Sequence, residues 1–179
     1  MLELPLEDAT PENIAPFGEF VAFGRGGSAS RTRFYDDAVE LAAKPAFSSD
    51  ADTCLSVARV QPRPLEVIWM ERHFKHTQAF LPLNRQPYCV VLAPPGDAAL
   101  PDLAKLKALR FEGDCGFLMH IGTWHEFPFA LDAAADLVVV LRNETNRNLE
   151  AIADGEAVGE DLEKRHLGKR FGVCLRIVR

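Results

Sequence analysis

The sequence lacks a long hydrophobic run, and no apolar stretch approaches the roughly 20 residues that cross a bilayer. The first residues also lack a positive charge followed by a long apolar segment, so we expect no signal peptide. Basic residues number 20 against 26 acidic ones, and the net charge of −6 argues against a whole-chain nucleic-acid binder. We therefore expect a cytoplasmic protein that binds neither a membrane nor a nucleic acid.

Cysteine is scarce and widely spaced. The four cysteines form no CxxC pair, and they are Cys54, Cys89, Cys115 and Cys174. A secreted domain built on disulfides would be shorter and denser in cysteine. The pattern predicts reduced, mostly buried thiols.

Proline and glycine, 12 of each, interrupt the 179 residues so often that long helices have little room. The composition, 47% apolar and 26% charged, is that of a globular protein with a sizeable core. Alternating or continuous apolar runs predict short strands at 55–60, 65–71, 78–83, 88–93, 117–120, 136–141 and 171–178. Strands at this spacing favour an antiparallel sandwich or barrel. With no repeat or linker, one domain over residues 1–179 is predicted.

Two short segments gather polar side chains that are suited to chemistry. In a strand, residues two apart share a face, so Glu71 and His73 project together. Gln78 on the following strand can return to the same space, and His120 or His125 can approach from a neighbouring strand. Such groups either ligate a divalent metal or act as acid and base, unless they are surface or satisfied core histidines.

At these segments the sequence resembles the ureidoglycolate lyase family. The resemblance is carried by Glu71–His73, Thr77–Leu83 and Gly122–His125, and it is dense between Ser56 and Arg142. It implies a cupin fold, which is an all-β double-stranded barrel (jelly roll) with minor short helices, and a homodimer. It also implies an enzyme of purine metabolism and allantoin degradation that eliminates urea from (S)-ureidoglycolate and leaves glyoxylate.

The cupin metal pattern falls on Glu71, His73, Gln78 and His125 in this sequence. Glutamate stands where the pattern has its first histidine, and glutamine where it has a carboxylate. Because an amide is a poorer ligand than a carboxylate, the resemblance implies a weakly held divalent metal, nickel in this family.

The reaction that the resemblance implies needs a base, an acid and a cation. We expect Glu71 and His73 as the base and acid pair, His125 as a third polar wall, and His120 as an assisting group. A guanidinium suits the substrate carboxylate, and Arg59 in the preceding strand is the predicted clamp.

Two departures from the family keep other functions open. The charged stretch 143–179 differs from the family's shorter end, and His76 stands where the motif commonly has a small residue. The alternatives are a cupin paralogue acting on another small hydroxy acid or acyl urea, a metal-dependent cupin enzyme of another reaction type, and a non-catalytic cupin that binds a small ligand. Metal analysis and a turnover assay distinguish them.

Overall fold

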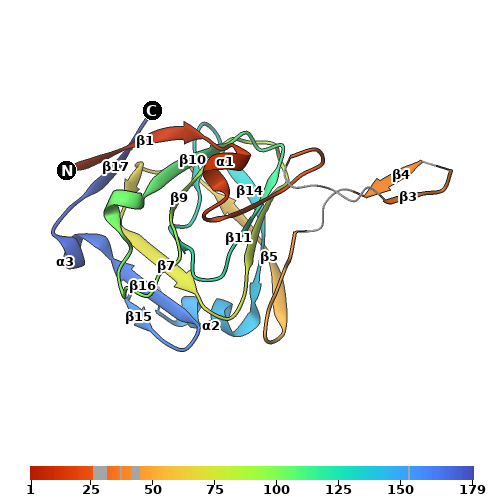
Figure 1. Ribbon diagram of the computed structural model, residues 1–179. Helices are drawn as coiled ribbons and strands as arrows, with labels where there is room; N and C mark the ends of the chain where they lie inside the picture. Colours follow the sequence, from red (N-terminus) through yellow and green to blue (C-terminus); the bar gives the residue numbers. More distant parts are fainter. Residues whose placement is uncertain (26–31, 37, 42–44, 153) are drawn as a thin grey trace.

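Two facing β-sheets make up most of the computed structural model, which describes residues 1–25, 32–36, 38–41, 45–152 and 154–179 (Figure 1). Along the larger sheet the strands are β15 (Ala157–Val158), β16 (Leu162–His166), β7 (Trp69–His73), β12 (Trp124–His125), β9 (Tyr88–Ala93), β10 (Lys107–Phe111), β1 (Leu2–Asp8), β17 (Leu175–Val178) and β6 (Glu66–Val67), with β13 (Phe129–Ala130) paired to β9 off this path. The smaller sheet consists of β2 (Gly18–Val21), β11 (Gly116–Met119), β8 (Gln78–Pro82), β14 (Ala135–Arg142) and β5 (Thr53–Val60). A separate two-stranded sheet pairs β3 (Thr32–Phe34) with β4 (Val39–Leu41).

Helices are few and short among the described residues. They are α1 (Pro11–Ile14), the 3₁₀-helix η1 (Leu103–Lys105), α2 (Asn143–Ile152) and α3 (Leu167–Phe171). The hydroxyl of Thr10 caps α1 by accepting from the Asn13 amide, and Pro11 occupies the first turn. No helix in the described part of the chain is long and apolar enough to cross a membrane. The expected all-β fold with minor short helices is confirmed.

The core lies between the two sheets. Val90 and Leu92 of β9 pack into one cluster with Phe80 of the smaller sheet, whereas Cys89 and Val91 face a second cluster on the other side of β9. Strand β9 is thus buried on both faces, which explains its continuous apolar sequence. Burying a large apolar side chain contributes about 1.5–3 kcal/mol, so these clusters fix the strands that carry the polar groups. Two sheets packed around a shared core agree with the all-β barrel that the resemblance implies.

The segment after Arg142 adds structure to the larger sheet. It continues through α2 into the β15–β16 hairpin, and β16 pairs antiparallel with β7, beside which it lies in Figure 1. The predicted strand at the C-terminal end is β17, which pairs in parallel with β1. The two chain ends consequently lie near each other in Figure 1.

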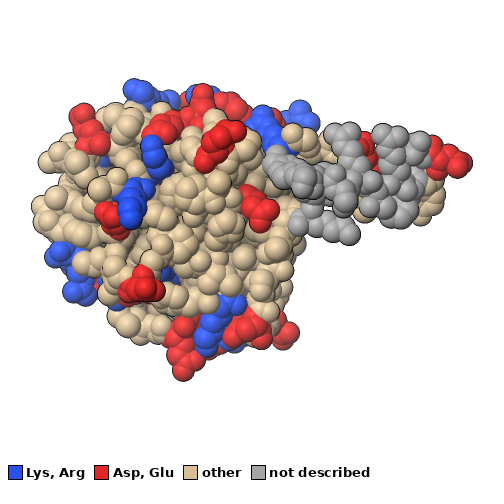
Figure 2. All heavy atoms as spheres, viewed as in Figure 1, with Lys and Arg blue, Asp and Glu red and all other residues tan. Residues whose placement is uncertain are grey.

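The surface mixes charged groups with an apolar strand face. Acidic and basic side chains intermingle over the face seen in Figure 2. On the edge strand β5, Cys54 and Ala58 pack against the core, and Leu55 and Val57 point outward with 69% and 63% exposure. Exposed apolar side chains on an edge strand are typical of a surface that another chain covers.

Candidate active site

Strand β7 directs Glu71 and His73 into the barrel. Because strand residues alternate, Met70 and Arg72 face the other side, where Met70 joins the second core cluster and Arg72 Nε donates to Glu163 at 2.7 Å. Glu71 and His73 are 8% and 3% exposed. The strand therefore holds two ionisable side chains in the barrel interior, as the alternation predicts.

Strand β12 brings His125 to the same place. The turn before it needs Gly122, whose φ of +81° lies in the left-handed region and whose amide donates to the His73 carbonyl at 2.7 Å. His125 then pairs across the strands with Glu71. His125 Nδ1 lies 3.1 Å from the Thr123 carbonyl oxygen. Because a carbonyl oxygen can only accept a hydrogen bond, Nδ1 carries the proton and donates it. The other ring nitrogen, Nε2, lies 3.5 Å from Glu71 Oε1.

The charges of this cluster are set by burial and by its neighbours. Burial alone would raise the pKa of Glu71, but the adjacent His125 and His73 imidazoles and the Lys164 ammonium lower it below its usual value. Burial, with the nearby His125, lowers the pKa of His73 to about 3. At neutral pH an ionised carboxylate thus lies beside a neutral imidazole, which is the form that binds a metal.

The donor atoms fit a divalent metal. The ligand atoms of Glu71, His73 and His125 lie within 4.8 Å of one another. Within the described part of the chain, both ring nitrogens of His73, Nε2 of His125 and Oε1 of Gln78 are buried without a hydrogen-bond partner. Unpartnered buried polar atoms are rare in folded proteins, and imidazole with carboxylate suits borderline divalent metals. Of the four predicted ligands, three lie within ligand reach of one another, and Gln78 is buried at the start of β8.

The structure does not bring His120 or Arg59 to this cluster. His120 lies in the turn after β11, with a 41% exposed side chain and its Nε2 3.9 Å from Glu19. Arg59 lies on the outward face of β5, 68% exposed, and its Nε donates to Asp136 at 2.7 Å. Since Ala58 faces the core, alternation turns Arg59 outward, so the predicted carboxylate clamp does not lie at the cluster.

Three polar residues near the cluster were not predicted as site residues. His76 Nδ1 lies 3.3 Å from Asp161, and the His76 ring stacks on His73 at 4.7 Å between centroids. Lys164 of β16 lies directly across from Glu71. The departure of His76 from the family motif is a sequence signal that could have marked it. Asp161 and Lys164 come near the cluster only through the pairing of β16 with β7, which the local sequence does not indicate.

A pocket of about 290 Å³ opens onto the cluster. Its lining consists of Trp69, Glu71, His125, Glu126, Phe127, Asn146, Leu149, Glu150 and Lys164. Helix α2 supplies one wall through residues spaced three and four apart, which share a helix face. Its opposite face lines a second pocket of about 310 Å³.

The fold and the cluster together define a class, an all-β protein of two facing sheets with a buried carboxylate–imidazole centre beside a small pocket. A sequence profile described as Ureidoglycolate lyase matches residues 1–159. A protein named Ureidoglycolate lyase from Burkholderia mallei is 34% identical over 156 residues, which cover 83% of this chain and 88% of that protein. One of the same name from Pseudomonas syringae is 32% identical over 155 residues, with the same coverage. The chain belongs to the ureidoglycolate lyase family.

The comparisons also mark the part of the site that the family profile does not include. The profile ends at residue 159, so Asp161 and Lys164 lie beyond it. Among solved structures, Streptomyces albus HEPD with 2-hydroxyethylphosphonate and Fe(II) bound aligns with 77% of this chain and 28% of its own, at 14% identity and a TM-score of 0.35.

Proposed function

We propose that this chain is a carbon–nitrogen lyase that eliminates urea from (S)-ureidoglycolate and leaves glyoxylate, as in allantoin degradation. One observation carries the proposal. Glu71, His73 and His125 form a buried acid–base and metal-ligating cluster beside a pocket of about 290 Å³, within the part of the chain that the family profile matches. A pocket of this size suits a small substrate.

The reaction moves one proton, in total, from the substrate hydroxyl to the departing nitrogen, and it needs no redox partner. The substrate hydroxyl loses its proton as the aldehyde carbonyl forms, the bond from that carbon to the urea nitrogen breaks, and the nitrogen gains a proton. Glu71 suits this transfer, because its lowered pKa keeps it ionised at neutral pH and ready to accept the hydroxyl proton. The same carboxyl group then returns the proton to the departing nitrogen. A positioned acid or base contributes roughly 10²- to 10⁴-fold to a rate.

Glu71, His73 and His125, with Gln78, would hold a divalent metal, and the family resemblance implies nickel. When bound, the metal supplies Lewis-acid polarisation of a substrate oxygen. The chain prepares its donors for this role, since Thr123 fixes the Nδ1 proton of His125 and leaves Nε2 free. Glu71 has two carboxylate oxygens, so ligation by one leaves the other for proton transfer.

Lys164 takes the role that the sequence assigned to Arg59. It pairs across the strands with Glu71 and lines the same pocket, so its side chain faces the reacting groups. Its Nζ lies 4.9 Å from the centre of the Trp69 ring, at the pocket wall. An ammonium at this place binds the substrate carboxylate.

The test is glyoxylate release from (S)-ureidoglycolate, measured before and after chelation and again after nickel is added back. We expect activity that falls on chelation and returns with nickel. Glu71→Gln removes it, whereas His120→Ala, which changes an exposed imidazole outside the cluster, retains it. If the chain turned over another hydroxy acid or acyl urea but not (S)-ureidoglycolate, the substrate would have to be reassigned. If it bound one of these compounds but turned over none, it would be a binding protein.

We also propose that residues 1–179 form one domain that works in the cytoplasm as a homodimer. The outward apolar side chains of Leu55 and Val57 support a partner on the β5 face. Light scattering at micromolar concentration should give the mass of two chains. Leu55→Asp should give the mass of one chain with unchanged circular dichroism, and a wild-type monomer would contradict the dimer.

A further inference from the structure

Helix α2 places two polar side chains on the wall of the pocket beside the cluster. Asn146 and Glu150 are four residues apart, so they share a helix face, and both line the pocket that Glu71, His125 and Lys164 also line. Asn146 Nδ2 donates to Glu150 Oε1 at 2.8 Å. This hydrogen bond holds the two side chains together at the pocket wall.

The pair offers a defined set of donors and acceptors. A carboxamide has two N–H donors and one acceptor oxygen, and an ionised carboxylate has acceptors only. The bond between them uses one N–H of Asn146 and part of the capacity of Glu150 Oε1. Among the hydrogen bonds of the described residues, one N–H and Oδ1 of Asn146 and Oε2 of Glu150 then remain for a molecule in the pocket. One donor among several acceptors matches a carbamoyl group, which has one carbonyl oxygen and an NH₂.

The other polar groups of the pocket are committed elsewhere. Glu126 Oε2 accepts from the amides of Ile68 and Trp69, both at 3.1 Å, and Glu126 Oε1 accepts from Arg63 at 3.3 Å. The carboxylate and imidazole of the cluster face the reacting atoms, and Lys164 suits the substrate carboxylate. The α2 pair is therefore the part of the wall that suits the ureido end of the substrate.

We propose that Asn146 and Glu150 form a subsite for a carbamoyl group, and that this subsite holds the ureido end of the substrate while Lys164 binds its carboxylate. The inference rests on the proposed lyase function and deepens it by assigning residues to the leaving urea. Glu150 also makes the subsite selective. Its negative charge accepts from an NH₂ group and repels a carboxylate in the same place, so a second anionic group on the ligand is disfavoured.

Two analogues that cannot be cleaved test this subsite. Malamate keeps the carboxylate, the hydroxyl and the carbamoyl group of ureidoglycolate and has a methylene in place of the nitrogen that leaves. Malate differs from malamate only by a carboxylate in place of the carbamoyl group. Binding of each compound, in the configuration that matches the substrate, is measured by titration calorimetry on the full chain. We expect malamate to bind about 10-fold or more tightly than malate, because Glu150 repels the second carboxylate.

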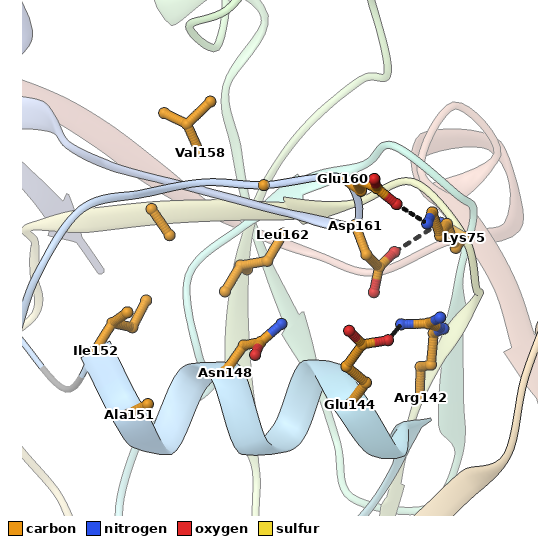
Figure 3. Close-up of a pocket in the computed structure, with 12 residues that line it drawn as sticks. Lys75, Arg142, Glu144, Asn148, Ala151, Ile152, Val158, Glu160, Asp161 and Leu162 are labelled. Atoms are coloured by element: carbon orange, nitrogen blue, oxygen red, sulfur yellow. Dashed lines mark hydrogen bonds and ion pairs between the residues drawn. The ribbon is translucent and has the colours of Figure 1, made fainter.

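Helix α2 also provides a matched control. Asn148 extends from the same helix toward the second pocket, on the face that carries Glu144 and Ile152 (Figure 3). Asn146→Ala and Asn148→Ala change helix propensity equally, so their difference reports the pocket that each side chain faces. Asn146→Ala should lower the affinity for malamate about 3- to 10-fold, as expected for the loss of neutral hydrogen bonds. Asn148→Ala should bind malamate as the wild type does.

Glu150→Gln removes the repulsion and should narrow the preference for malamate over malate to about 3-fold or less. Circular dichroism checks that each variant is folded. Wild-type affinity for malamate in Asn146→Ala would overturn the inference, as would an equal loss in Asn148→Ala or an unchanged preference in Glu150→Gln. Glyoxylate release by a wild type that does not prefer malamate would overturn the subsite and leave the lyase function standing. Binding of malamate that depends on Asn146, without release of glyoxylate from (S)-ureidoglycolate, would support the subsite and overturn the lyase function.

Discussion

Replacing Lys164 with methionine tests how the pocket recognises an anion. The change keeps most of the apolar stem and removes the charge that faces Glu71 across β16 and β7. Two unit charges about 4 Å apart attract by about 4 kcal/mol at an effective dielectric constant near 20. Because Lys164 is only half-buried at the pocket wall, a net loss of about 1.5–3 kcal/mol is expected, which is the usual range for a hydrogen bond to a charged group. That loss lowers kcat/KM about 10- to 100-fold.

The assay is steady-state glyoxylate release, and the loss should appear mainly in KM, because the carboxylate is bound in both the ground state and the transition state. Lys164 also helps to lower the pKa of Glu71, and Glu71 must be ionised to act as a base. Activity is therefore present above that pKa and lost below it, and Lys164→Met moves the acidic limb of kcat/KM to higher pH. Arg59→Met is the matched control and should leave both parameters unchanged. A raised KM in Arg59→Met, with none in Lys164→Met, would refute the placement of the anion site.

Three further outcomes are expected. Glu71→Gln should lower kcat by roughly 10²-fold or more while the melting temperature changes little, because the group lines a polar cavity; equal losses in His120→Ala would contradict the assignment. Arg170 and the His166 amide lower the pKa of Glu156 to about 2, so its contribution to stability is complete above the unfolded-state pKa and is lost as the pH falls toward 2. Melting temperatures between pH 5 and 2 should consequently fall less in Glu156→Gln. Arg72→Ala should destabilise the fold by about 1.5–3 kcal/mol in urea unfolding, because buried Glu163 loses one guanidinium partner and keeps Arg165 as the other. A loss below about 1 kcal/mol would show that the Arg72–Glu163 pair contributes little.

Most of the barrel was predictable because its strands are short and strongly patterned. The runs predicted at 55–60, 88–93 and 136–141 lie within β5, β9 and β14. Local alternation also placed Glu71 and His73 on one face, because that relation depends only on the backbone of a single strand. The order of the strands in each sheet was not predictable from these runs, since it depends on contacts between distant segments.

The same limit explains which site residues were missed. Leu162–His166 is rich in charge and shows no apolar alternation, so nothing local marks it as a strand beside β7. Its charged residues are tolerated there because Glu163 is buried against Arg72, while Lys164 faces the pocket. Pairing in the sheet, and not composition, makes this charged segment part of the site.

Arg59 and Lys164 show that proximity in sequence does not determine which cation lies beside Glu71. Arg59 lies on β5, which precedes the strand of Glu71 in the chain but belongs to the smaller sheet. Because strand residues alternate and Ala58 faces the core, the Arg59 side chain faces outward. Lys164 is far along the chain, yet its strand is the direct neighbour of β7, and the register sets it opposite Glu71. Residues paired across neighbouring strands share a face, so the cation and the carboxylate enter the same pocket. The C-terminal segment thus supplies the proposed anion-binding lysine, and a change of substrate in this chain would arise there.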